Sequence, residues 1–320
     1  MLNFSDYEDT FDPGAPRRKK LTPNYKPKRR RVEIVASLAD KAAPTGDGFN
    51  PTFSASRHEH EWIVNYLGPF YDDHQITDVL RLVKGGKEAN VYCCAAHPAL
   101  GAELLAAKVY RPRMFRNLRN DALYRRGREI LDAEGKAVRD PKALVAAAKK
   151  TSFGQELLHT SWLAHEGNTL RLLVEAGADV PRIFARGENA ILMTYLGDRD
   201  SPAPTLNHVT LPPRRARPLF DRLLHNVELM LAHRKVHGDL SAYNVLYWEG
   251  DICIIDFPQA IDPFTNPAAF GIFRRDVTRL CEYFDKYGIS ANAGQLARTL
   301  WDKHVVAKQE PELPTEDVEE

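Results

Sequence analysis

The segment HGDLSAYNVLYWEGDICIIDFPQAID, residues 237–262, constrains the fold of this chain more than any other stretch. Asp239 and Asn244 form an Asp-x4-Asn pattern, and a turn and a short apolar strand then lead to Asp256. Phosphoryl transfer needs these groups, because one carboxylate takes the proton of the attacking hydroxyl while an amide oxygen and a second carboxylate hold magnesium. Each residue alone also fits an ordinary turn or cap, so motifs elsewhere must decide.

A glycine turn lies upstream, where residues 82–94 predict a strand, a turn and a second strand. Glycines let backbone amides approach a phosphate closely, although most such turns are simple hairpins. The turn is not a Walker loop, because Gly86-Lys87 is not followed by Ser or Thr. The next expected strand, residues 104–110, carries Lys108 inside an apolar run, which is the setting of a kinase lysine that contacts phosphates.

A long helix is predicted between residues 153 and 176, because its apolar residues follow helical spacing and Gly177 fits a left-handed C-cap. Glu166 lies within this helix, and we predict that it forms an ion pair with Lys108. A helical glutamate is more often a solvated surface group, so this prediction depends on the sequence around Lys108.

Two further strands are expected at residues 180–183 and 190–196. The segment from Met193 through Tyr195 to Leu196 would connect a small five-stranded lobe to a helical lobe, and its backbone groups would contact an adenine edge. Helical spacing then predicts helices around residues 220–231, 273–284 and 289–306.

Composition divides the chain of 320 residues into lobes and tails. The expected parts are a basic disordered tail at 1–57, a small lobe at 58–197 with a mobile insertion at 111–150, a helical lobe at 198–306, and an acidic disordered tail at 307–320. Net charge is only +1, yet residues 17–31 are strongly basic, which is typical of a solvated tail and equally of a segment that contacts nucleic acid.

The cysteines and the apolar runs bear on the cellular compartment. Four cysteines form no CxxC pair, which disfavours zinc and suits a reducing cytosol. No signal pattern and no run of membrane-spanning length occurs. We therefore expect a cytoplasmic protein with no membrane partner.

The order of these motifs resembles that of proteins with a protein-kinase-like fold. The sequences of the motifs are most similar to the RIO family of atypical serine/threonine protein kinases. The similar segments are Gly86–Tyr92 for the phosphate loop, His237–Asn244 for the catalytic loop, Ile255–Gln259 for the metal loop, and Arg275–Val277 for the following helix. Together they span roughly residues 80–285. The resemblance implies an α+β bilobal fold with a small antiparallel sheet, a mainly helical second lobe and no activation segment.

The resemblance also implies a role for individual residues. Asp239 would be the catalytic aspartate, Asn244 and Asp256 would bind magnesium, and Asp256 could itself be phosphorylated in an ATPase cycle. ATP would be the substrate, with Mg²⁺ or alternatively Mn²⁺. The implied nucleotide-binding residues are Gly86, Lys87, Glu88, Lys108, Glu166, Met193, Tyr195, Leu196 and Ser241.

Two absences support the resemblance: Gly238 stands where ordinary kinases place an arginine, and no APE segment follows. RIO proteins likewise lack the activation segment, so a long peptide substrate is hard to accommodate. Two features depart from the family, and one is the long basic N-terminal tail, which is not part of the shared core. Lys84-Gly85 replaces the small hydroxylic residues that are usual in the family, which leaves the phosphate contacts of this loop open. No winged-helix domain precedes the core, which favours a bacterial-like member over the subgroup that carries one.

Three functions remain open at this stage. The first is a RIO-type ATP-dependent kinase or ATPase that acts on a protein serine, on itself or in ribosome assembly, with RNA contacts through the basic segments 17–31 and 111–128. The second is a small-molecule phosphotransferase like the aminoglycoside or choline kinases, against which Ser241-Ala242-Tyr243 and Phe257-Pro258 argue. The third is a scaffold that binds nucleotide or RNA without turnover.

Overall fold

The structure is a computed structural model that describes residues 48–86, 88–110, 124 and 126–308. The basic segment 17–31, the acidic end from residue 309, most of the basic segment 111–128, and Lys87 of the glycine turn lie outside these residues. The properties expected of them stay predictions.

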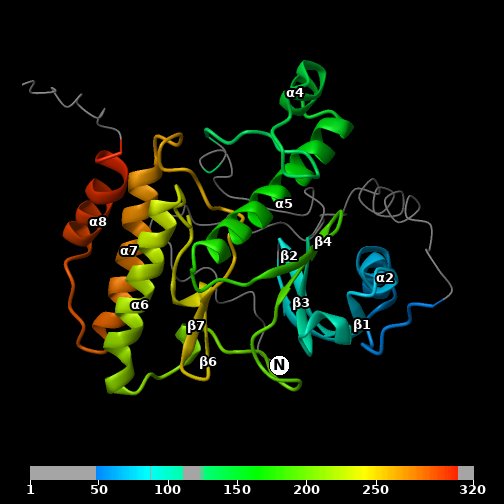
Figure 1. Ribbon diagram of the computed structural model, residues 1–320, viewed down its shortest axis with the longest axis horizontal. Helices are drawn as coiled ribbons and strands as arrows, with labels where there is room; N and C mark the ends of the chain where they lie inside the picture. Colours follow the sequence, from blue (N-terminus) through cyan, green and yellow to red (C-terminus); the bar gives the residue numbers. More distant parts are fainter. Residues whose placement is uncertain (1–47, 87, 111–123, 125, 309–320) are drawn as a thin grey trace, which may run out of the picture. The chain divides into compact units, whose positions relative to one another are not determined.

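The first lobe is built on a five-stranded sheet with the strand order β1-β2-β3-β5-β4, in which all neighbours are antiparallel (Figure 1). Its strands are β1 (Ile76–Gly85), β2 (Ala89–Ala96), β3 (Leu104–Tyr110), β4 (Ile183–Arg186) and β5 (Ala190–Thr194). The small antiparallel sheet predicted from the sequence is confirmed.

Side-chain alternation along β3 decides which face of the sheet each residue serves. Leu105 and Val109 join one buried cluster with the helix that precedes the sheet, whereas Tyr110 packs with Trp162 on the other face. Successive side chains of a strand point to opposite faces, so Lys108 shares the face of Tyr110. The strand register therefore directs Lys108 toward the long helix that contains Trp162.

Helix α2 (Arg57–Asp72) covers the first of these faces. Its N-cap is Ser56, whose side chain accepts a hydrogen bond from the Glu59 amide at 3.4 Å. Phe49 and Phe53, which precede this helix, pack in the same cluster. Packing thus begins ahead of residue 58, where the sequence indicated the start of the lobe, because two isolated aromatic residues leave no periodic signal.

The described residues between β3 and β4 include the helices α4 (Pro141–Ala148) and α5 (Ser152–Glu175). The side chain of Thr151 caps α5 by accepting a hydrogen bond from the Gly154 amide at 3.1 Å. Gly177, with φ of +79°, follows the helix in the left-handed conformation predicted for it. Helix α4 lies within the insertion at 111–150, for which the sequence predicted partial helicity.

The second lobe is mainly helical (Figure 1). Its helices and its hairpin strands are α6 (Pro213–Ala232), α7 (Ala269–Asp285), α8 (Ala293–Trp301), the π-helical turn η6 (Asp302–Val306), β6 (Val245–Trp248) and β7 (Asp251–Ile254). Short 3₁₀ turns occur at η2 (Pro98–Leu100), η4 (Leu206–His208) and η5 (Ala242–Asn244). The predicted last helix begins later than residue 289, because Asn292 caps it through the Gln295 amide.

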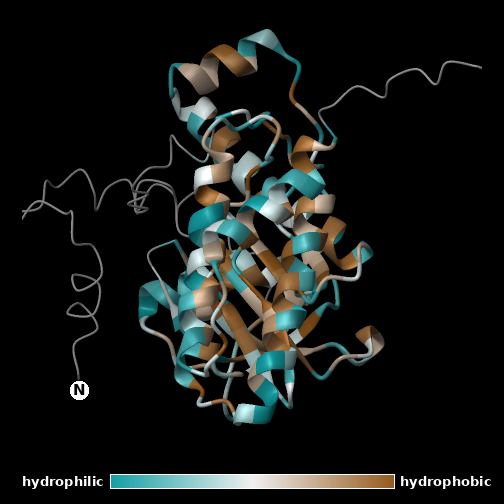
Figure 2. Ribbon diagram, turned by 90° about the vertical axis from the view of Figure 1, so that its left-hand side faces the viewer, coloured by the Kyte–Doolittle hydropathy of each residue, from teal (hydrophilic) through white to brown (hydrophobic). Residues whose placement is uncertain are grey.

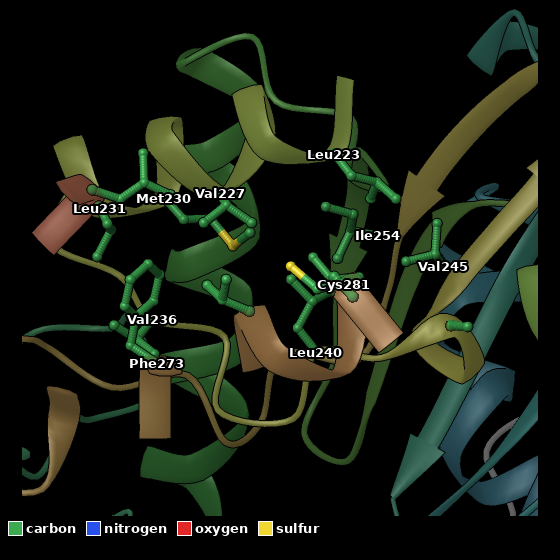
Figure 3. Close-up of a cluster of buried hydrophobic side chains, with 14 of the residues drawn as sticks. Leu223, Val227, Met230, Leu231, Val236, Leu240, Val245, Ile254, Phe273 and Cys281 are labelled. Atoms are coloured by element: carbon green, nitrogen blue, oxygen red, sulfur yellow. The ribbon is translucent and has the colours of Figure 1, made fainter. Parts of the chain in front are cut away.

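The core of this lobe joins α6 and α7 to the hairpin. Figure 3 shows Val227 and Met230 of α6, Phe273 of α7, and Leu240 of the segment before η5 in one buried cluster. Figure 2 shows apolar residues concentrated on the interior strands and helix faces. Among the described residues, no helix combines the length and apolarity that crossing a bilayer requires.

Candidate active site

The loop that carries Asp239 is held from both sides. Leu240, only 2% exposed, anchors it in the apolar core, and Gly238 has a φ of +86°. The Gly238 amide donates a hydrogen bond of 2.8 Å to Oδ2 of Asp276, which is buried on α7. A Cβ atom at Gly238 would lie 2.5 Å from the carbonyl oxygen of Gln259, so only glycine fits this turn. The backbone thus fixes where Asp239 emerges.

Asp239 has two side-chain partners. Arg279 of α7 donates from Nη1 to Oδ1 at 2.8 Å, and Nδ2 of Asn244 lies 3.3 Å from Oδ2. The same Asn244 nitrogen donates to the backbone oxygen of Asp239 at 2.9 Å. The Asp-x4-Asn pattern is therefore a closed loop in which the asparagine holds the aspartate through its amide nitrogen.

The hairpin of β6 and β7 brings Asn244 to the metal loop. The strands pair Val245 with Ile254, and the Ile255 amide donates to the Asn244 carbonyl at 2.9 Å. Asp256 follows directly, with a φ of +74°. Positive φ is uncommon for a residue with a side chain, and it turns Asp256 out of the strand direction at this point.

Lys108 connects the two lobes through two carboxylates. Its Nζ donates to Oε1 of Glu166 and to Oδ1 of Asp256, each at 2.7 Å. The side chain of Lys108 is 10% exposed, that of Glu166 is 1% exposed, and that of Asp256 is 41% exposed. The predicted pair of Lys108 and Glu166 is thus present as a buried contact, and Asp256 remains open to solvent.

Charge and burial act in opposite directions on the pKa values of Lys108 and Asp256. Burial lowers the pKa of Lys108, but the attraction of Asp256 and Glu166 is stronger and leaves its pKa above the ordinary value. Desolvation likewise raises the pKa of Asp256, and the ammonium of Lys108 more than compensates, so the net shift is downward. Lys108 and Asp256 are therefore both charged at neutral pH.

Glu166 accepts hydrogen bonds from two groups besides Lys108. The Tyr110 hydroxyl donates to its Oε2 at 2.5 Å, and the Phe257 amide donates to its Oε1 at 3.3 Å. A buried carboxylate is costly unless it is paired and hydrogen-bonded, and here both oxygens have partners. The contact to Phe257 ties α5 to the metal loop beside Asp256.

The oxygen atoms of Asn244 and Asp256 fit magnesium. The Asn244 nitrogen serves Asp239, and no described residue donates to the amide oxygen, which therefore remains for a metal. Amide and carboxylate oxygens are the ligands of a hard cation, which commonly takes the rest of its shell from water and phosphates. Within the described part of the chain, no three His, Cys, Asp or Glu residues form a metal cluster.

The structure defines the local surroundings of three other residues predicted at the site. Met193 packs on the side of the sheet that faces α5 and is 8% exposed. The Tyr195 hydroxyl donates a hydrogen bond to the Asp198 carbonyl oxygen at 3.1 Å. A Cβ atom at Gly86 would lie 2.9 Å from the Ala89 carbonyl oxygen, which shows how tight the glycine turn is.

The nucleotide contacts predicted for Ser241, Glu88 and Leu196 stay predictions, as do those of the residues above. The Ser241 hydroxyl caps η5 by accepting from the Tyr243 amide at 3.4 Å. Glu88 and Leu196 flank the sheet and the hinge, and nothing in the described contacts ties either to a nucleotide. The roles expected of these residues stay predictions.

Sequence reasoning did not identify two residues that contact the site. Arg279 reaches Asp239, and Arg128 donates from Nη2 to the carbonyl oxygens of Pro258, at 2.9 Å, and Ala260. Neither lies in a motif, and arginines are common in the segments around both. The only signal for Arg279 was its position one helical turn after Asp276, on the same face of α7.

The two lobes, one with a small antiparallel sheet and one mainly helical, define a protein-kinase-like fold. The site is also kinase-like, because one lysine contacts both a helix glutamate and an aspartate at the end of a strand. A family model described as the RIO domain matches residues 123–296, which is more than half of the chain. The chain therefore belongs to the RIO family, and the RIO-type serine/threonine kinase class predicted from the sequence is confirmed.

Individual relatives agree. The chain is 30% identical to the RIO-type serine/threonine-protein kinase Rio1 of Thermoplasma acidophilum, over 42% of this chain and 69% of the relative. It is also 30% identical to the Rio1 of Haloferax volcanii, over 67% of this chain and 66% of the relative. For human serine/threonine-protein kinase RIO1 the identity is 27%, over 67% of this chain but 34% of the relative.

A solved structure shows the same fold. The Rio2 kinase of Chaetomium thermophilum, crystallised as an ADP/Mg²⁺-phosphoaspartate complex, superposes with a TM-score of 0.50 and 18% identity. The superposition covers 84% of this chain and 75% of that chain. It supports the bilobal kinase fold.

Proposed function

We propose that this chain is a magnesium-dependent enzyme that transfers the γ-phosphate of ATP to a protein serine or threonine, or transiently to its own Asp256. The observation that carries the proposal is the position of Lys108, whose Nζ lies 2.7 Å from both Glu166 and Asp256. A lysine held in this way on the small sheet can meet phosphate oxygens, while Asp256 approaches the same lysine from the other lobe.

Each polar residue has a task in this reaction. Lys108 would bind the α- and β-phosphates, and Asn244 and Asp256 would hold the metal, which when bound neutralises charge on the phosphates. In the kinase reaction the acceptor oxygen forms a bond to the γ-phosphorus, the bond from that phosphorus to the ADP oxygen breaks, and Asp239 accepts the hydroxyl proton. Asp239 is 43% exposed, so an acceptor can reach it.

The ATPase reaction uses the same groups differently. A carboxylate oxygen of Asp256 forms the bond to phosphorus, ADP leaves, and no proton has to be removed because the carboxylate is already ionised. Water then attacks the phosphoaspartate, with Asp239 taking the proton of that water, and phosphate is released. The phosphoaspartate named for the Rio2 relative supports this alternative, and so does the 41% exposure of the Asp256 side chain.

The experiment that tests the proposal follows γ-labelled ATP with magnesium in wild type, Asp239→Asn, Asp256→Asn and the control Asp221→Asn. Asp221 pairs with Arg217 on the exposed face of α6 and should not matter. Hydroxylamine-labile label that is lost in Asp256→Asn indicates the aspartyl-phosphate cycle, whereas stable phosphoserine lost in Asp239→Asn indicates the kinase. If ATP binds and neither label nor free phosphate appears, the enzyme proposal fails and a scaffold role replaces it.

Partners of this enzyme follow from charge. We propose that the basic segments 17–31 and 111–128 contact RNA or a ribosomal particle. We also propose that Mn²⁺ can replace Mg²⁺ in the metal site. The protein is further proposed to act in the cytoplasm. Each phosphate contact by Lys or Arg steepens the salt dependence of binding. Replacing the basic residues of 17–31 by glutamine should flatten the plot of log affinity against log salt for the full chain, and an unchanged slope would refute RNA contact by that segment.

A further inference from the structure

Helix α7 holds the catalytic loop by side chains one turn apart. Asp276 accepts the Gly238 amide at 2.8 Å, and Arg279, three residues later on the same helix face, donates to Oδ1 of Asp239 at 2.8 Å. Val277, which lies between them, is 1% exposed, and Leu280, which follows Arg279, is completely buried in the core. Packing thus fixes the backbone position from which the Arg279 side chain reaches Asp239.

The two oxygens of Asp239 are held unequally. Oδ1 accepts the charge-assisted bond from Arg279 at 2.8 Å, whereas Oδ2 has only the amide nitrogen of Asn244 at 3.3 Å. That nitrogen has a shorter bond, at 2.9 Å, to the backbone oxygen of Asp239. Since the charged and shorter contact is the stronger one, Oδ2 is the oxygen that an incoming hydroxyl can take over at least cost.

The ion pair contributes little to the stability of the fold. The side chains of Arg279 and Asp239 are 39% and 43% exposed, and solvent screens the attraction of an ion pair that is this exposed. The same exposure lets a substrate approach the pair. Arg279 therefore adds little stability, and its effect is to set the orientation of the proposed catalytic carboxylate by fixing one of its oxygens.

Resting on the function proposed above, we propose that Arg279 is a positioning residue for Asp239. Its guanidinium holds Oδ1 and thereby directs Oδ2 toward the acceptor hydroxyl. Arg279 itself touches neither ATP nor the acceptor, and it moves no proton. Its effect should therefore appear in the rate of phosphoryl transfer and vanish when Asp239 can no longer act.

The test uses the full-length chain with Arg279→Gln, Arg279→Lys and the control Arg217→Gln, which removes an exposed arginine–aspartate pair on α6. We expect Arg279→Gln to lower kcat on the order of 10- to 100-fold, the range set by a small misplacement of a catalytic group. The KM for ATP, the affinity for ADP with magnesium, and the Tm should stay near wild type. Arg279→Lys should recover part of the rate, because it keeps the charge.

The decisive comparison adds Arg279→Gln to Asp239→Asn. A positioning residue that acts through Asp239 adds no further loss in this background. A loss by the same factor as in wild type, a raised KM for ATP with unchanged kcat, or a kcat equal to or above wild type would overturn the inference. If Asp239→Asn alone keeps the wild-type rate, the proposed function fails first, whatever Arg279 does, so the two failures are distinguishable.

Discussion

The ammonium of Lys108 lies 2.7 Å from Oδ1 of Asp256, as close as it lies to Oε1 of Glu166. One positive charge therefore joins the small sheet, helix α5 and the metal loop of the helical lobe. The contact to Asp256 occupies an oxygen that a metal or a phosphorus would need. We expect Lys108 to move toward phosphates when nucleotide binds, which frees Oδ1 of Asp256.

Removal of Lys108 should destabilise the protein as well as inactivate it. Lys108→Met leaves Glu166, only 1% exposed, as an uncompensated buried carboxylate, and breaking such pairs costs about 3–5 kcal/mol. Adding Glu166→Gln should recover much of this stability while ATP turnover stays absent. Urea unfolding and phosphate release measure the two effects, and a double variant no more stable than Lys108→Met would contradict the prediction.

Gly238 should tolerate no side chain. Gly238→Ala costs the strain of a positive φ and also places Cβ 2.5 Å from the Gln259 carbonyl oxygen, so the loop must shift and Asp239 with it. Gly288→Ala is the matched control, because Gly288 has a φ of +75° and a Cβ atom there would meet no heavy atom within 4 Å. We expect both to lower the Tm, but only Gly238→Ala to lower kcat by at least an order of magnitude. Equal kcat values in the two variants would count against this view of the turn.

The stability of the protein should fall in acid partly because of His165. Burial lowers its pKa from the ordinary 6.5 to about 4, helped by the charges of Arg128 and Lys235 and opposed by its hydrogen bond to the Glu129 carbonyl. The unfolded chain then binds the extra proton between about pH 6.5 and pH 4, so this contribution is present above pH 6.5 and lost as the pH falls.

His165→Asn removes this titration. The variant is expected to lose less unfolding free energy than wild type between pH 7.5 and pH 4.5, by about 1–2 kcal/mol after allowance for partial exposure. Urea unfolding at the two pH values measures the difference, and carboxylates that titrate in both proteins cancel. Identical losses in the two proteins would show that His165 protonates in the folded state as easily as in the unfolded chain.

Arg128 should keep the metal loop in place. It donates to the carbonyl oxygens of Pro258 and Ala260, just after Asp256, so Arg128→Ala leaves both without this partner. We expect faster amide exchange in residues 256–261 and a several-fold higher magnesium concentration for half-maximal turnover, since the loop no longer presents Asp256 in one place.

The control for this prediction lies in the same segment. Arg139 pairs with Glu129 on the surface, with side chains 80% and 61% exposed, and Arg139→Ala should change neither quantity. The prediction fails if the two variants behave alike, or if Arg128→Ala shows wild-type exchange in residues 256–261.

The sequence by itself determined the local parts of this protein. The order of glycine turn, strand lysine, helix glutamate and Asp-x4-Asn loop predicted two lobes and a kinase class. The spacing also predicted the long helix with Gly177 at its end. These features are local, because caps, strand alternation and helical periodicity depend on residues a few positions apart.

Only the tertiary structure decided the contacts between distant segments. The pairing of Lys108 with Glu166 was predicted, but its equal contact with Asp256, 148 residues away, was not. Nor did any pattern indicate that Arg279 holds Asp239 or that Arg128 holds the loop after Asp256. Such contacts arise where tertiary packing brings a long charged side chain to a loop that is distant in the sequence, and a lone arginine in a sequence carries no sign of the partner it will meet.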